Sequence, residues 1–364
     1  DYTLQVTRTR DSLEGEASIT VNGEEQEIAV IVYTKRTITV QIKDESGNPL
    51  ENAGVVAVSG DTRYDGITDR NGNAELVLGR GTWELTGTKG ELKGNTTVAV
   101  EGEDKTVSMT LYRPSYDVKI KITSGSGKGR FYKCAIYSEK GFLVKETTAY
   151  LDGECYLKEK LKTGRYCVEI ISGLMEKTGD VYYGATEWIQ VEGETNRSMY
   201  VVKPDIQCSV EGHTLYVNGS GYLDVGRVLE KFLDSDVNRI VLGYGIETVG
   251  QLGGYSKELK AANKKVTEIV LPSSLRVIHD EAFKTFEGLK NLDIPSGVVH
   301  SGGRNFSNAT MDNVTLHSSY AGSYGSVVRT ENLIIDAEKV NCGFVGYAKN
   351  VVITDKVKEL YIYF

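Results

Sequence analysis

Short hydrophobic triplets recur through the last third of the chain, from residue 240 onward. In each triplet two aliphatic residues flank a variable one, and this two-residue period is typical of a short strand with one buried face. Successive triplets begin 29, 23, 22, 19, 18 and 9 residues apart, so all but the last spacing leave room for one strand and one return segment. Because such a strand cannot cover its own apolar face, it must stack on the next one, and the pattern predicts a solenoid. The triplets are Ile240-Val241-Leu242, Ile269-Val270-Leu271, Leu292-Asp293-Ile294, Val314-Thr315-Leu316, Leu333-Ile334-Ile335, Val351-Val352-Ile353 and Leu360-Tyr361-Ile362.

The middle residues of the triplets are the candidate ligand-binding residues. If the flanking pair points inward, the middle residues form a strip on the opposite face, on the order of 30 Å long for seven strands. Most of them are apolar or aromatic, more than a solvated face needs, which indicates a surface for a protein or a glycan. The alternatives are that neighbouring segments cover the strip, or that β-branched residues simply suit strands. The predicted strip consists of Val241, Val270, Asp293, Thr315, Ile334, Val352 and Tyr361.

A second repeat occupies the first part of the chain. It spans residues 2–33, 81–112 and 164–202, and each copy has an aromatic residue near its start, alternating strands and a Gly-Glu pair that favours a turn. The copies lie about 80 residues apart, the size of a small β-sandwich. Pro114 and Pro204 stand at the junctions, where a residue that lacks an N–H helps to end a strand.

Four parts follow from these two repeats. Residues 1–35 would be the rear part of a preceding β module, or else strands that complete the next one. Residues 36–113 and 114–204 would each be a β-sandwich, and residues 205–364 the solenoid. An amphipathic helix that caps the solenoid is expected after Asp224, with Val225, Val228, Leu229, Phe232 and Leu233 on one face.

The first predicted sandwich resembles a known family. The stretches Thr39-Val-Gln-Ile-Lys-Asp-Glu-Ser-Gly-Asn-Pro-Leu-Glu-Asn-Ala-Gly-Val55, Thr68-Asp-Arg-Asn-Gly-Asn-Ala-Glu-Leu76 and Gly81-Thr-Trp83 look like a CnaB-like or carboxypeptidase-regulatory-like domain. The resemblance implies a transthyretin-like sandwich used as a stalk module in bacterial surface proteins. Some members carry an isopeptide cross-link. Here Thr39 stands in place of the reactive lysine and Gly87 in place of the catalytic glutamate, so we expect hydrophobic packing to hold the module instead.

The last part has a resemblance of its own. Val266-Thr-Glu-Ile-Val-Leu-Pro-Ser-Ser-Leu-Arg-Val-Ile278, Glu281-Ala-Phe283 and Leu289-Lys-Asn-Leu-Asp-Ile-Pro295 are similar to the BspA-like leucine-rich repeat of bacterial surface proteins. Together the two resemblances imply a mainly β chain, with tandem transthyretin/Ig-like β-sandwich modules followed by a leucine-rich-repeat solenoid.

Composition excludes some partners and compartments. The formal net charge of -8, without a Lys or Arg cluster, argues against nucleic acid. No apolar run reaches the roughly 18 residues that span a bilayer, so no membrane insertion is expected within the chain. Both ends of the chain lie in strand-like segments, so we expect it to be part of a longer protein. The two resemblances imply that this protein is extracellular, either secreted or at the cell surface.

The chain shows no motif for catalysis, a cofactor or a metal. His213, His279, His300 and His317 lack metal-ligand spacing, and we expect them to be solvated or hydrogen-bonded surface groups. The segment Asp69-Arg-Asn-Gly-Asn73 lacks the later ligands of a calcium loop and favours an Asn-Gly turn.

Strand alternation assigns the cysteines to faces. Cys134 and Cys155 are expected in the sandwich core as thiols, with a disulfide between them as the alternative, and Cys167 is expected on the outer face.

The sequence therefore predicts a non-catalytic surface protein of a bacterium. Its stalk modules would present a leucine-rich-repeat surface to a host or bacterial surface protein, or to a glycan. The alternative is a carbohydrate-binding accessory region of a secreted enzyme, in which Trp83 or Trp188 would stack on sugars, although both stand where core aromatics are expected.

Overall fold

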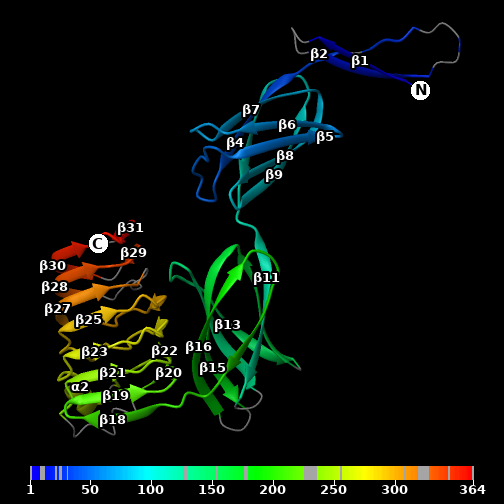
Figure 1. The fold of residues 1–364 in the computed structure, drawn as a ribbon. Coiled ribbons are helices and arrows are strands. Elements are labelled where there is room, and N and C mark those ends of the chain that lie inside the picture. Colours follow the sequence, from blue (N-terminus) through cyan, green and yellow to red (C-terminus); the bar gives the residue numbers. More distant parts are fainter. Residues whose placement is uncertain are drawn as a thin grey trace. The chain divides into compact units, whose positions relative to one another are not determined.

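The fold is mainly β, as the sequence predicts, and it divides into two compact units, Asp1–Ser115 and Tyr116–Phe364 (Figure 1). The computed structural model describes residues 2–8, 13–20, 23, 27–30, 32–125, 129–152, 154–175, 179–224, 236–254, 256–306, 309–318, 328–342 and 345–362. The helix predicted after Asp224 lies outside the described residues.

The first unit holds a β-sandwich and a separate small sheet. The small sheet consists of β1 (Tyr2–Arg8), β2 (Leu13–Ile19) and β3 (Tyr33–Thr34), and in the described residues it is not hydrogen-bonded to the sandwich. One sandwich sheet has the order β10 (Lys105–Thr110), β4 (Arg36–Lys43), β7 (Asn73–Leu78). The other has the order β6 (Thr62–Ile67), β5 (Gly54–Ser59), β8 (Gly81–Lys89), β9 (Leu92–Val100).

Hydrophobic packing fills this first sandwich. Trp83 is 4% exposed and lies in the core, as expected, where its indole N–H donates to the Gly79 carbonyl at 2.9 Å. A Cβ at Gly87 would lie only 2.6 Å from the sulfur of Met109 and 2.8 Å from Cδ2 of Leu111. Core side chains therefore occupy the space that a glutamate at position 87 would need. The segment from Asp69 to Asn73 is a turn, in which Asp69 accepts hydrogen bonds from two backbone N–H groups of the turn.

The second unit begins with another sandwich. Its last three strands have the same topology as the last three strands of the first sandwich. In both sandwiches the third strand of the sequence repeat crosses over and pairs in parallel with the opening strand, β10 with β4 and β17 with β11. All seven strands join edge to edge in the order β16, β15, β12, β13, β14, β11, β17. Their bounds are β11 (Ser115–Ser124), β12 (Gly129–Ser138), β13 (Leu143–Asp152), β14 (Glu154–Lys162), β15 (Gly164–Met175), β16 (Gly179–Val191) and β17 (Thr195–Val201).

The cysteines of this sandwich are buried free thiols. Cys134 and Cys155 lie in its core, as predicted. The prediction for Cys167 is wrong, because this residue is fully buried rather than on an open outer face. It does leave the sandwich core, but it packs in a separate cluster with Val277 and Val299 of the solenoid. Strand alternation gave the correct face of the sandwich, and the solenoid covers that face.

The solenoid has a front and a back sheet of stacked strands, which Figure 1 shows from β18 to β31. The front sheet begins with an antiparallel pair and is otherwise parallel: β18 (Gln207–Glu211), β19 (Thr214–Asn218), β21 (Arg239–Leu242), β23 (Glu268–Val270), β25 (Asn291–Ile294), β27 (Thr310–Leu316), β28 (Val328–Ile335) and β30 (Val345–Ile353). The back strands are β20 (Gly221–Leu223), β22 (Ile246–Val249), β24 (Val277–Ile278) and β26 (His300–Ser301), followed by the pair β29 (Lys339–Cys342) and β31 (Glu359–Ile362).

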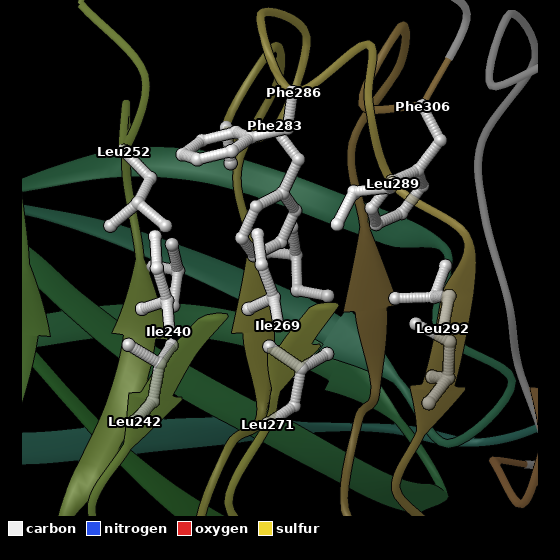
Figure 2. Close-up of a cluster of buried hydrophobic side chains, with 14 of the residues drawn as sticks. Ile240, Leu242, Leu252, Ile269, Leu271, Phe283, Phe286, Leu289, Leu292 and Phe306 are labelled. Carbon is white, nitrogen blue, oxygen red and sulfur yellow. The ribbon is translucent and has the colours of Figure 1, made fainter. Parts of the chain in front are cut away.

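The flanking residues of the triplets form the solenoid core. Figure 2 shows Ile240 and Ile269 on successive front strands, facing Leu252 and the phenylalanines of the return segments. There Phe283 stacks on Phe306 with ring centroids 5.2 Å apart and meets Phe286 edge-on at 6.2 Å. The short helix α2 (Lys257–Asn263) follows β22 and is capped by the side chain of Ser256, which accepts from the Leu259 N–H.

Two expectations for the end of the solenoid are wrong. The flanking residues Val351 and Ile353 are 50% and 53% exposed, because β30 is the last strand of the front sheet and no further described rung covers it. The seventh triplet, around Tyr361, lies in the back strand β31 and pairs with β29. Its spacing of nine residues is the distance from a front strand to its own return strand. The three predicted boundaries between the four parts stay predictions.

Candidate binding surface of the solenoid

The outer face of the front sheet carries two columns of side chains in parallel register. The first column begins with Arg239 and Glu268, which form a 2.8 Å ion pair, and continues with Asn291, Asn313, Asn332 and Asn350. The second column contains six of the seven predicted strip residues: Val241, Val270, Asp293, Thr315, Ile334 and Val352. Tyr361 is absent from it, because β31 belongs to the back of the solenoid.

The asparagines of the first column form a hydrogen-bonded ladder. The side-chain amide of Asn313 donates to Asn291 at 2.8 Å, that of Asn332 to Asn313 at 3.1 Å, and that of Asn350 to Asn332 at 2.9 Å. Each interior amide thus uses its N–H₂ group toward one neighbour and its oxygen toward the other. The ladder adds side-chain hydrogen bonds to the parallel backbone pairing that holds these four strands in register.

A network of charged groups lies just past the C-terminal ends of the front strands. His317, directly after β27, lies between two carboxylates, with Nδ1 2.9 Å from Asp336 and Nε2 3.4 Å from Asp293. Asp336 also accepts from the Lys356 ammonium at 2.7 Å and from the Thr354 hydroxyl at 2.8 Å. These donors, Lys356 foremost, lower the pKa of Asp336 to about 2. The carboxylate therefore stays charged at any physiological pH.

The columns and this network border a groove of about 1240 Å³. Three predicted strip residues, Val270, Asp293 and Thr315, line it. The end of the groove at the charged network carries more carboxylates than cations. The carboxylates are those of Asp293, Asp336, Glu338 and Asp355, and the cations are those of Lys356 and Lys358. Val241, Ile334 and Val352 stand in the same column but outside the groove lining. The groove thus offers an apolar and hydroxyl-bearing floor with an excess of negative charge.

Sequence reasoning missed the asparagine ladder and the charged network, although both leave a periodic signal. An asparagine directly precedes four successive triplets, and His317, Asp336 and Thr354 directly follow three of them. In the part of the chain that the structure describes, no group of three or more His, Cys, Asp or Glu side chains is placed to hold a metal ion.

The back of the solenoid packs on the second sandwich around a buried carboxylate. Glu169 is fully buried and accepts hydrogen bonds from the hydroxyls of Tyr137 and Thr248, at 3.0 and 3.1 Å. Its third partner is Nε2 of His279, at 3.0 Å. Burial opposes a charge on His279, but the Glu169 carboxylate and its hydrogen bond outweigh this and raise the pKa of His279.

The histidines are therefore hydrogen-bonded, as expected, but not all lie on an open surface. His279 retains only 26% exposure of its side chain. His300 stacks on Tyr137 with ring centroids 4.7 Å apart, and its Nδ1 lies 2.9 Å from the Gly141 carbonyl. Beside them, Thr186 donates both its backbone N–H and its hydroxyl to Glu247. These contacts make residues 116–364 one packed unit.

The chain was compared with curated proteins, solved structures and protein families. The sequence matches no curated protein. Among solved structures, the Bacillus anthracis TIE protein aligns over 55% of this chain and 42% of its own, with 15% identity and a TM-score of 0.33. The minor pilin GBS52 of Streptococcus agalactiae aligns over 48% and 99%, with 11% identity and a TM-score of 0.22. The shaft pilin spaA of Lactobacillus rhamnosus GG aligns over 48% and 100%, with 9% identity and a TM-score of 0.20.

A family model matches a segment within the solenoid. Residues 261–327 match the BspA type leucine rich repeat region. This segment includes the strands β23, β25 and β27, whose outer residues line the groove. No helix among the described residues is long and apolar enough to cross a membrane. The family match confirms the predicted resemblance: the segment from 261 to 327 is a BspA-type leucine-rich-repeat region.

Proposed function

We propose that the chain is a non-catalytic protein of a bacterial surface, in which β-sandwich modules support a leucine-rich-repeat domain that binds a protein partner at the front groove. The observation that carries this proposal is the groove itself. It has a volume of about 1240 Å³, and a hydrogen-bonded ladder and ion pairs form its border. A preorganised surface of this kind loses little conformational entropy when it binds a partner.

The charge of the groove indicates which part of a partner would dock there. Asp293 is 67% exposed on its side chain, and Asp355 is exposed as well. Because carboxylates outnumber cations at this end, a segment of the partner that carries Lys or Arg would gain favourable electrostatic contacts. We therefore propose an extended, positively charged protein segment as the ligand of the groove.

A selection from a random peptide library, displayed on phage and carried out on the immobilised full chain, tests this function. The wild-type protein should enrich peptides rich in Lys and Arg, and raised salt should weaken their binding. The double variant Asp293→Asn, Asp355→Asn should bind the same peptides at least tenfold more weakly.

A matched control removes two carboxylates outside the groove, on the front strands β27 and β28. The variant Asp312→Asn, Glu331→Gln changes the charge equally, and both residues are exposed and absent from the groove lining. It should bind as the wild type does. Equal binding by all three proteins would show that the groove is not the binding surface.

A further inference from the structure

A second cleft, of about 580 Å³, lies between the second sandwich and the back of the solenoid. It contains Tyr361, the residue that the sequence pattern placed on the front strip, together with Trp188, the tryptophan that is only partly buried. Its volume falls in the range of about 300–1,000 Å³ that small-ligand sites occupy. The cleft and the front groove share Ser296 and Glu338 in their linings, but Phe142, Trp188 and Tyr361 line the cleft alone.

Both walls of the cleft are held in place by contacts within the second unit. On the sandwich side, the turn between β12 and β13 is closed by the hydrogen bond from the Ser138 N–H to the Phe142 carbonyl. The same turn is bound to the solenoid through the Gly141 carbonyl and His300. On the solenoid side, the parallel strands β29 and β31 are joined by the ion pair of Lys339 and Glu359 at 3.0 Å. The cleft is therefore largely preformed.

Aromatic rings line the cleft, and two of them are accessible. Phe142 is 47% exposed and Tyr361 is 56% exposed. Trp188 lies deeper, with the Arg165 guanidinium 4.3 Å from its ring centroid. An aromatic face that is open to solvent in a concave site favours a ligand with a flat apolar face of its own.

The charges around the cleft cancel. The carboxylates of Glu139, Glu338 and Glu359 are matched by the cations of Lys140, Arg165 and Lys339. A ligand with a strong net charge would therefore gain little from this site. These charged side chains, among them the Lys339–Glu359 pair, still offer hydrogen-bond donors and acceptors in the lining of the cleft.

We propose that this cleft binds a neutral oligosaccharide. A sugar ring presents apolar C–H groups on one face and hydroxyl groups around its edge. The C–H face would pack on the rings of Tyr361 and Phe142, and the hydroxyls would hydrogen-bond to the paired charged side chains. The ligand class follows from exposed aromatic rings combined with zero net charge.

Binding of the full chain to an array of neutral and acidic oligosaccharides, followed by calorimetric titration with the neutral glycans bound most strongly, tests the proposal. Tyr361→Ala and Phe142→Ala should each weaken binding at least tenfold, while Tyr361→Phe, which keeps the ring, should bind within about threefold of the wild type. The control Tyr150→Ala removes a ring that is 69% exposed, more than that of Tyr361, from strand β13 outside the cleft lining, and should leave glycan binding unchanged.

Thermal unfolding of each variant shows whether the change is local, since exposed positions should keep the wild-type transition. The proposal is overturned if no neutral glycan on the array binds, if only acidic glycans bind, or if Tyr361→Ala binds as well as the wild type. Peptide binding at the front groove is measured separately with the phage-selected peptides, so failure at one site leaves the other result intact.

Discussion

Replacing His279 by Ala tests how the solenoid is fixed to the sandwich. Glu169 is fully buried, and the substitution removes one of its three hydrogen-bond partners. Breaking a buried pair by deleting one partner typically costs about 3–5 kcal/mol, because the remaining charge stays buried. The His279 side chain retains 26% exposure, so solvent screens the pair and we expect a loss of about 2–3 kcal/mol.

The pH dependence of the wild-type protein gives the sign. The folded pKa of His279 is raised above its ordinary value of 6.5. The contribution of the pair is therefore fully present below about pH 6.5 and is lost as pH rises through the higher folded pKa. Guanidinium unfolding at pH 6 and pH 9, followed by circular dichroism, should show this decline in the wild type but not in His279→Ala.

The measurement needs a control for the other buried ring at this junction. Burial lowers the pKa of His300, so this residue favours the folded state when it is neutral, and its contribution is lost as pH falls. His300→Gln should therefore leave the decline above pH 6.5 unchanged. A His279→Ala protein with wild-type stability at pH 6 would refute the reasoning, since it would mean that Glu169 does not depend on this partner.

Three further predictions concern the ladder, the thiols and the first sandwich. Asn332→Ala breaks two rungs of the ladder and should lower the unfolding free energy by about 1–2 kcal/mol, whereas Asn350→Ala breaks one and should cost less than about 1 kcal/mol; equal losses in denaturant titrations would contradict the ladder. Burial raises the pKa of Cys167 to about 12, so iodoacetamide should label Cys208, which is partly exposed, well before Cys167, as peptide mass spectrometry can follow. Gly87→Ala forces a Cβ against core side chains and should cost about 1–3 kcal/mol in thermal unfolding; a transition unchanged from the wild type would show that the core yields at no cost.

The sequence predicts the solenoid well because its strands have a local signal. The alternation in triplets such as Ile240-Val241-Leu242 determines which residues point inward, whatever the neighbouring rung is. The second column on the outer face of the front sheet follows from it. Burial of Val351 could not be predicted, because it depends on whether another rung stacks on β30. The prediction that Tyr361 lies on the front sheet was wrong, because a front strand and its return strand have the same two-residue period.

Contacts between segments that are distant in the chain could not be predicted from the sequence. Cys167 has the alternation of an outward residue, and only the docking of the solenoid buries it. Likewise, Asp293, His317 and Asp336 lie on different rungs, and it is the parallel register that places them side by side. The middle residues of the triplets could be proposed as a surface, but the groove that includes some of them depends on side chains beyond the strand ends.

The asparagine ladder also bears on how proteins of this kind change length. Asn313, Asn332 and Asn350 make the same bond to the rung before them, so each joint between rungs is interchangeable. Excising one complete repeat would bring two asparagines together that already fit, without a new contact having to evolve. Unequal recombination within the gene could therefore lengthen or shorten the front sheet in steps of about 20 residues, typical of leucine-rich repeats, and leave the fold intact.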